Sequence, residues 1–118
     1  MVEVVRTRTV QCLEERLHHT VDILLCNPPY VATQTEETGS KGLAAAWAGG
    51  EEGMDVTRQV IDSLEELLSP SGVAYIVLEQ CNQPASVRQY VGTLGFTCTT
   101  VIERRAGREL LSVIKISR

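Results

Sequence analysis

The sequence has no apolar segment approaching the roughly 20 residues that a membrane-spanning helix needs. Its amino terminus also lacks the apolar core of a signal peptide. Its four cysteines (Cys12, Cys26, Cys81 and Cys98) include no C-x-x-C pair, which argues against both a zinc site and a disulfide framework. We therefore expect an intracellular protein, in the cytoplasm and also in the nucleus, with reduced thiols, no bound metal and no membrane contact.

Positive charge is also scarce, since the 118 residues carry a net charge of -4. This balance argues against binding to nucleic acid through overall charge. The one basic cluster, Arg104 to Arg108, contains a glycine between two strand-like runs, so we interpret it as a solvated hairpin tip rather than a binding patch. His18 and His19 are adjacent, so we expect their rings to point apart in a polar loop rather than to form a metal site.

The length and the hydrophobic content of 43% fit one small domain with a modest core. The expected strands are Val2 to Val5, Val21 to Cys26, Val73 to Leu78, Phe96 to Glu103 and Glu109 to Ser117. The expected helices are Thr9 to Leu17, one that begins at Asp55 and ends before Ser69, and one that is capped by Asn82 and ends at Gly95. Alternating strands and helices predict an α/β fold with a mainly parallel sheet and a final antiparallel hairpin.

The most informative stretch is the apolar run Val21 to Cys26 and the four residues after it. A run without polar alternation predicts a strand that is buried on both faces. Pro28 and Pro29 stop this strand, so Asn27 lies at its carboxyl end. Ligands of open α/β sheets bind outside the carboxyl ends of strands, so we expect the functional site here.

The residues from Asn27 to Tyr30 suit the handling of a planar nitrogen. The side-chain oxygen of Asn27 and the carbonyl of Pro28 can each accept one N–H of an amide or aromatic amine, which would aim its lone pair at an electrophile. Pro29 restricts the conformation of Pro28, and Tyr30 can stack on the substrate group. The alternative is a simple turn after a strand with a half-buried ring.

Four segments along the chain carry a family resemblance: Asn27 to Tyr30, Ala45 to Gly50, Leu67 to Gly72 and Ala106 to Val113. With them, the sequence resembles the HemK family, and more closely its eukaryotic and archaeal branch, the release-factor glutamine methyltransferases. The resemblance covers nearly the whole chain. The Asn-Pro-Pro-Tyr motif alone is shared by many amino-methyltransferases, whereas the block around Trp47 is more specific to this branch.

The resemblance implies a class I, Rossmann-like fold that uses S-adenosylmethionine, with strand order 3-2-1-4-5-7-6. It implies that Asn27 and Pro28 hold the substrate amide, with Asn27 also beside the cofactor. Tyr30 would stack on the amide, and Trp47 would help shape the substrate cleft. The implied substrate is the glutamine of a Gly-Gly-Gln loop in a translation release factor, with protein lysine and adenine as alternatives. The implied partner is a small zinc-binding activator subunit, which would make a heterodimer.

Two departures from this family pattern matter. The sequence contains no G-x-G, whereas the family has a glycine-rich turn after its first strand, and the acidic residue expected near the adenine aligns with Arg8. We therefore expect residues 1 to 118 to be one partial domain, the C-terminal part from the third strand (Val2 to Val5) onward, without the cofactor-binding region. The strand Val21 to Cys26 would then be an apolar edge. Such a chain could be inactive alone, and the alternative function is a non-enzymatic interaction module.

Overall fold

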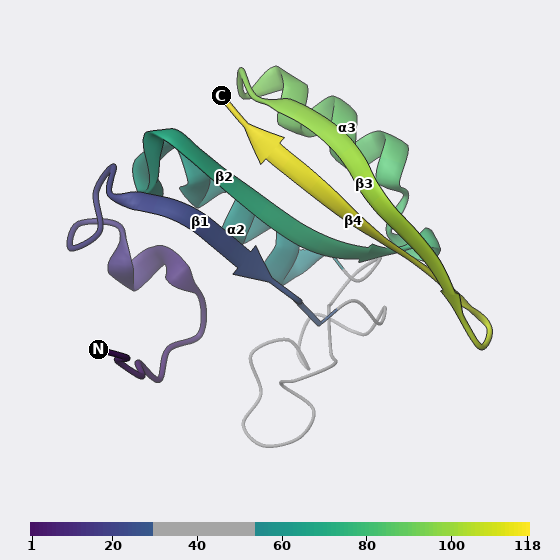
Figure 1. Cartoon of the computed structure of the whole chain (residues 1–118), viewed down its shortest axis with the longest axis horizontal. Coiled ribbons are helices and arrows are strands. Elements are labelled where there is room, and N and C mark those ends of the chain that lie inside the picture. The colour runs from purple at the N-terminus through teal and green to yellow at the C-terminus, as the bar shows by residue number, and fades with distance from the viewer. Residues whose placement is uncertain (30–53) are drawn as a thin grey trace.

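The computed structural model describes residues 1–29 and 54–118. Figure 1 shows the helices and strands in these ranges. In chain order they are η1 (Val10–Leu13), β1 (Val21–Cys26), α2 (Asp55–Leu67), β2 (Leu68–Glu79), η4 (Gln80–Asn82), α3 (Pro84–Thr93), β3 (Thr97–Ala106) and β4 (Glu109–Ser117). None of the described helices is long and apolar enough to cross a membrane.

The strands form one sheet in the order β1-β2-β4-β3 (Figure 1). β1 and β2 are parallel, while β4 is antiparallel to both of its neighbours, β2 and β3. The α/β class and the final antiparallel hairpin are confirmed. β4 lies inside the sheet, as the apolar residues on both of its faces predict. The expectation of a mainly parallel sheet is wrong for the described strands, because only the β1–β2 pair is parallel.

One face of the sheet carries the core. Alternate residues of β2 and β4 point to this face, and the buried apolar side chains of α2 and α3 pack against them. Because both helices contribute to one cluster with the same face of the sheet, they lie on the same side of it. The fully buried members include Ile61 and Leu64 of α2, Val91 of α3, Ala74, Ile76 and Leu78 of β2, and Ile114 and Ile116 of β4.

Among the described residues, the opposite face of the sheet is exposed along β1. Leu24 and Cys26 point toward the helices and pack against the core. Ile23 and Leu25 point the other way and are 64% and 75% exposed. The expected strand Val21–Cys26 is therefore present with the expected bounds, but burial on both faces is wrong. The further expectation that this strand is an apolar edge is confirmed.

The first 20 residues differ most from expectation. The predicted strand at Val2 to Val5 is not formed, because no strand in the described ranges pairs with it, and its apolar side chains are exposed. Thr9 caps the next helix as predicted, with its side chain accepting from the backbone N–H of Gln11. That helix is only the single turn η1, and turns replace the rest of the expected helix up to Leu17.

The start of α3 is also different. Asn82 does not cap it, because its side chain accepts a hydrogen bond from the backbone N–H of Glu79 at 2.8 Å. The residue before the helix is Gln83, in a left-handed conformation, and Pro84 occupies the first turn as predicted. Gly95 follows the helix with a φ of +86°, which agrees with its predicted role at the carboxyl end. The apolar pattern of the sequence also predicts that Ala85, Leu94 and Ile102 lie on buried faces, but these side chains are exposed.

The exposure of Ile102 has a local cause. The pairing of β3 with β4 shifts register between Thr100 and Ile102, so the strict alternation assumed from the sequence is interrupted there. The position of β3 at the edge of the sheet is confirmed.

The junction of α2 and β2 is tightly packed. β2 begins at Leu68, five residues earlier than the sequence suggested, and a register shift lets the Ser69 to Gly72 segment bulge against β1. A Cβ atom on Gly72 would lie 2.5 Å from the carbonyl oxygen of Val21. Only glycine therefore allows β1 to approach this segment so closely.

The C-terminal residue secures the same junction. The guanidinium of Arg118 donates to the carboxylate of Glu65 at 2.8 Å and to the backbone carbonyls of Glu65 and Leu68 at 3.0 and 2.9 Å. It also lies 5.5 Å from the centre of the Phe96 ring, a distance at which a cation and an aromatic face attract. The end of β4 is thereby tied to the end of α2.

Candidate functional site

The predicted site begins at the carboxyl end of β1. Asn27 follows Cys26, the last residue of the strand, and is exposed, while Pro28 is buried and Pro29 half-buried. The buried proline fixes the chain against the protein, and the amide before it remains accessible. This position agrees with the sequence prediction.

The other two predicted site residues, Tyr30 and Trp47, lie outside the described residues. Their proposed stacking and cleft-shaping roles therefore stay predictions. The length of the connection from Tyr30 to Gly53 also predicts a partly helical stretch around Leu43 to Ala48, which likewise lies outside the described residues.

Glu79 lies at the neighbouring strand end, because β2 runs parallel to β1. Its carboxylate accepts hydrogen bonds from the backbone N–H groups of Cys81 at 2.6 Å and Leu110 at 3.4 Å. The hydrogen bonds from Cys81 are the main cause that lowers the pKa of Glu79. Glu79 is therefore an ionised, positioned acceptor that holds η4, and it is unsuited to act as a general base near neutral pH.

The cysteines do not provide a nucleophile at this end of the sheet. All four are thiols rather than halves of a disulfide, and burial raises the pKa of Cys26 and Cys98. Burial, followed by the Glu79 carboxylate, raises the pKa of Cys81 to about 11. These three thiols are protonated at neutral pH, and thiols are weak nucleophiles compared with thiolates.

A cavity of about 190 Å³ lies between α2 and α3, with Arg58, Asn82 and Tyr90 among its lining residues. Tyr90 donates a hydrogen bond to Asp62, which ties α3 to α2 beside the cavity. Asn27 does not line this cavity, so the structure does not bring the two together. Sequence reasoning missed the cavity because it forms from the packing of two helices, each of which shows only its own apolar periodicity.

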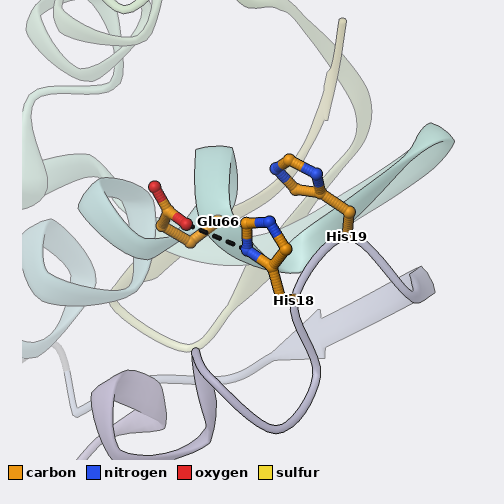
Figure 2. A group of neighbouring side chains, drawn as sticks. All are labelled: His18, His19 and Glu66. Atoms are coloured by element: carbon orange, nitrogen blue, oxygen red, sulfur yellow. Dashed lines mark ion pairs between the residues drawn. The ribbon is translucent and has the colours of Figure 1, made fainter.

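The histidines form a second unexpected feature. The rings of His18 and His19 stack with their centres 3.8 Å apart, so the expectation that they point apart is wrong. The reason is the backbone of His19, whose φ of 53° lies in the left-handed region and turns its ring back over that of its neighbour. Figure 2 shows both rings beside Glu66 of α2.

Comparisons with known proteins give consistent results, although no protein-family profile matches the chain. Methyltransferase HEMK2 of Mus musculus is 44% identical over 117 residues, which cover 99% of this chain and 55% of the relative. Methyltransferase HEMK2 of Homo sapiens is 41% identical over 117 residues, which also cover 99% of this chain and 55% of the relative. The eRF1 methyltransferase catalytic subunit mtq2 of Schizosaccharomyces pombe is 44% identical over 105 residues, which cover 87% of this chain and 46% of the relative.

A solved structure shows the same fold. The E. cuniculi Mtq2-Trm112 complex, described as responsible for the methylation of the eRF1 translation termination factor, contains a chain that matches with a TM-score of 0.74. The match covers 97% of this chain and 60% of that chain at 22% sequence identity, so it supports the fold alone. The described elements are therefore part of a Rossmann-like fold, with a mixed sheet of four strands.

The relatives named methyltransferases match nearly the whole chain, and the chain spans about half of their length. Methyltransferases of this kind use S-adenosylmethionine. Over nearly its whole length the chain therefore matches the HEMK2/Mtq2 family of methyltransferases, and it corresponds to about half of a member.

Proposed function

We propose that this chain is the substrate-binding part of an N-methyltransferase that acts on a protein side-chain amide. The proposed substrate is the glutamine of the Gly-Gly-Gln loop of a translation release factor. The observation that carries the proposal is the exposed amide of Asn27 at the carboxyl end of β1, followed by a buried proline, in a chain with methyltransferase relatives.

In this proposal, the chain's own residues bind and orient the nitrogen that receives the methyl group. The side-chain oxygen of Asn27 accepts one N–H of the amide, and the backbone carbonyl of Pro28 accepts the other. Pro29 limits the conformation of Pro28, so the two acceptors keep a fixed separation. Tyr30 stacks on the flat amide and Trp47 forms part of the cleft. Such orientation aligns the nitrogen lone pair with an electrophile.

The residues of this chain do not fit a complete site for S-adenosylmethionine. The sequence has no G-x-G turn, and in the described ranges Asn27 is the one proposed cofactor contact at the free edge of β1. We therefore place the donor site largely on a polypeptide that lies beside β1. The order β1-β2-β4-β3 with an antiparallel β4 supports this placement, because it corresponds to positions 4-5-7-6 of the sheet that the family resemblance implies.

The chain is then the C-terminal part of a methyltransferase domain, and residues 1 to 118 are one partial domain. A small zinc-binding activator subunit is the proposed partner of the assembled protein. The Mtq2–Trm112 complex supports this choice, since a partner subunit is present in that structure.

The test is methyl transfer by the reassembled protein. The chain is produced together with the amino-terminal region of a HEMK2 relative and with Trm112, and methylation of a Gly-Gly-Gln peptide is measured by mass spectrometry. Asn27→Ala should lower turnover by at least about 100-fold, because a misplaced acceptor nitrogen no longer faces the methyl donor. Gln89→Ala is the matched control, since it removes an exposed amide on α3 and should leave turnover unchanged.

Near-normal turnover of Asn27→Ala would overturn the role assigned to that residue. Release factor, a histone-tail peptide and adenine-containing DNA, compared side by side, identify the acceptor. We expect the release factor to be methylated fastest. Faster turnover of lysine or adenine would replace the proposed substrate but keep the amino-methyltransferase class.

A second candidate function is a non-enzymatic interaction module. The observation that favours it is the exposed apolar edge at β1 together with the absence of a glycine-rich turn. Calorimetry of the chain with S-adenosylmethionine separates the two candidates. Binding by the chain alone with the affinity of a whole enzyme would exclude the interaction module, and methyl transfer only after reassembly would support the partial methyltransferase.

A further inference from the structure

His18, His19 and Glu66, which we call the histidine cluster, meet where the turn before β1 contacts the end of α2 (Figure 2). Each residue offers one nitrogen or oxygen atom, and these three atoms lie within 4.8 Å of one another. All three residues are exposed, so a dissolved cation can reach them without any opening of the fold. The cluster lies at the amino end of β1, opposite the end that carries Asn27.

The backbone around the cluster is fixed by hydrogen bonds. The N–H of His19 donates to the backbone carbonyl of Glu66 at 2.8 Å, and the N–H of Thr20 donates to the carbonyl of Leu17 at 3.0 Å. The turn is thus tied to the same helical residue that supplies the carboxylate. β1 continues directly from this turn and pairs with β2, which limits its movement further.

The conformation of His19 is unusual for a residue with a side chain. Its φ of 53° is left-handed, which costs free energy for residues other than glycine. This conformation brings the ring of His19 over the ring of His18, with an angle of 25° between their planes. An ion pair accounts for the proximity of His18 and Glu66. That pair does not require the His19 ring to lie beside them.

The distances suit a transition-metal ion. Zinc binds histidine nitrogen and carboxylate oxygen at about 2.0 to 2.2 Å in a tetrahedron, which places neighbouring ligand atoms roughly 3.3 Å apart. The Nδ1 atom of His18 already lies 3.1 Å from the carboxylate oxygen of Glu66. The ligand atom of His19 is within 4.8 Å of both, and ligation requires the His19 ring to rotate out of the stack, because the nitrogen lone pair lies in the plane of its ring. Water can supply the fourth ligand, because the site faces solvent.

We propose that His18, His19 and Glu66 bind one divalent transition-metal cation of the Zn²⁺ type. Two imidazoles and one carboxylate are ligands that favour zinc, copper and nickel over magnesium or calcium. The bound ion joins the turn before β1 to α2, which are far apart in the sequence, and thereby stabilises the start of the edge strand. This inference is independent of the proposed methyl transfer, and it replaces the sequence-based expectation of a polar loop without metal.

The test is a titration of the 118-residue chain with ZnCl₂ by calorimetry. We expect one site, with affinity at least about tenfold weaker in His19→Ala and in Glu66→Gln. Glu65→Gln is the matched control on the adjacent position, because Glu65 pairs with Arg118 and lies outside the cluster. Its affinity should equal that of the unmodified chain. Absence of zinc binding, or equal affinity in His19→Ala, would overturn the proposal.

A second measurement separates the cluster from the thiols, which also bind zinc. CoCl₂ replaces zinc, and its absorption spectrum reports whether cysteine sulfur is a ligand. We expect tetrahedral bands without sulfur charge transfer, unchanged in Cys12→Ser and lost in His18→Ala. A sulfur charge-transfer band that persists in His18→Ala would assign the metal to the cysteines and refute the site. Circular dichroism confirms that each exposed substitution leaves the fold intact.

Discussion

Replacing Leu25 by threonine changes the face of β1 that the described residues leave uncovered. Leu25 is 75% exposed, so about a quarter of its surface is buried in this chain. Full burial of a leucine side chain contributes about 1.5 to 3 kcal/mol, so the substitution should cost the chain alone only about 0.5 kcal/mol. Threonine, unlike leucine, has a β-branched side chain, which favours the strand. The remaining 1 to 2 kcal/mol, roughly, should be lost only when another polypeptide covers β1.

Two measurements separate the small loss of stability in the chain alone from the larger loss of binding free energy. Urea denaturation gives the free energy of unfolding of the chain alone, and a binding assay gives its affinity for the amino-terminal region of a HEMK2 relative. Leu25→Thr should weaken this binding by about five- to thirtyfold while hardly changing the unfolding midpoint. The control is Ile102→Thr on β3, at the opposite edge of the sheet, where a residue of 58% exposure should affect neither binding nor unfolding by much. Equal binding of Leu25→Thr and the unmodified chain would refute the placement of a covering polypeptide at β1.

Three further predictions concern the chain alone. Gly72→Ala should lower the free energy of unfolding by about 1 to 3 kcal/mol, measured by urea denaturation, because its Cβ would lie 2.5 Å from the carbonyl oxygen of Val21. Arg118→Ala should lower it by about 1 to 2 kcal/mol, because one partly exposed guanidinium makes three charge-assisted hydrogen bonds, and Arg118→Lys should restore only part of the loss. Iodoacetamide at pH 8 should alkylate Cys81 at least about tenfold slower than an unfolded cysteine, because its pKa is raised to about 11, and Glu79→Gln should reduce this difference. An alkylation rate equal to that of the unfolded peptide would contradict the raised pKa.

Features fixed by local sequence were predictable. The double proline ends β1 at Cys26, and Asp55 begins α2 where its apolar periodicity starts. The glycine at position 95 and the turn glycine at 107 both adopt positive φ, as their places between regular elements suggested. In each case a single residue type, or the repeat of one helix, determines the outcome without help from distant residues.

Features that depend on distant partners were not predictable. Val2 to Val5 has a strand-like composition, but a strand needs a neighbour, and the described residues give it none. The exposure of Leu25 was unpredictable for the same reason. An apolar run indicates that a strand is suited to burial, but it does not show whether a neighbouring segment covers it. The stacking of His18 and His19 occurs in a turn whose His19 N–H donates to the carbonyl of Glu66, 47 residues away, and the sequence gives no sign of this contact.

The predicted site also combines features that local sequence determines with features that depend on distant residues. The position of Asn27 follows from the strand and the prolines, whereas the commitment of Glu79 to η4 required the structure. Glu79 directly follows the predicted strand Val73 to Leu78, which places it at a strand end, but the sequence gives no sign that backbone N–H groups hydrogen-bond to its carboxylate. The histidine cluster had a signal, two adjacent histidines, but the third ligand comes from another element.

The free side of β1 also has a consequence for the lifetime of the protein. β1 is an edge strand of the described sheet, so its outward backbone groups are suited to pair with an extended chain, and the exposed side chains of Ile23 and Leu25 favour such pairing. Any self-association through this strand would rise with concentration, whereas the polypeptide proposed beside β1 would compete for the same groups and protect the folded form by mass action. Under that proposal, the supply of the covering polypeptide would limit the amount of folded protein.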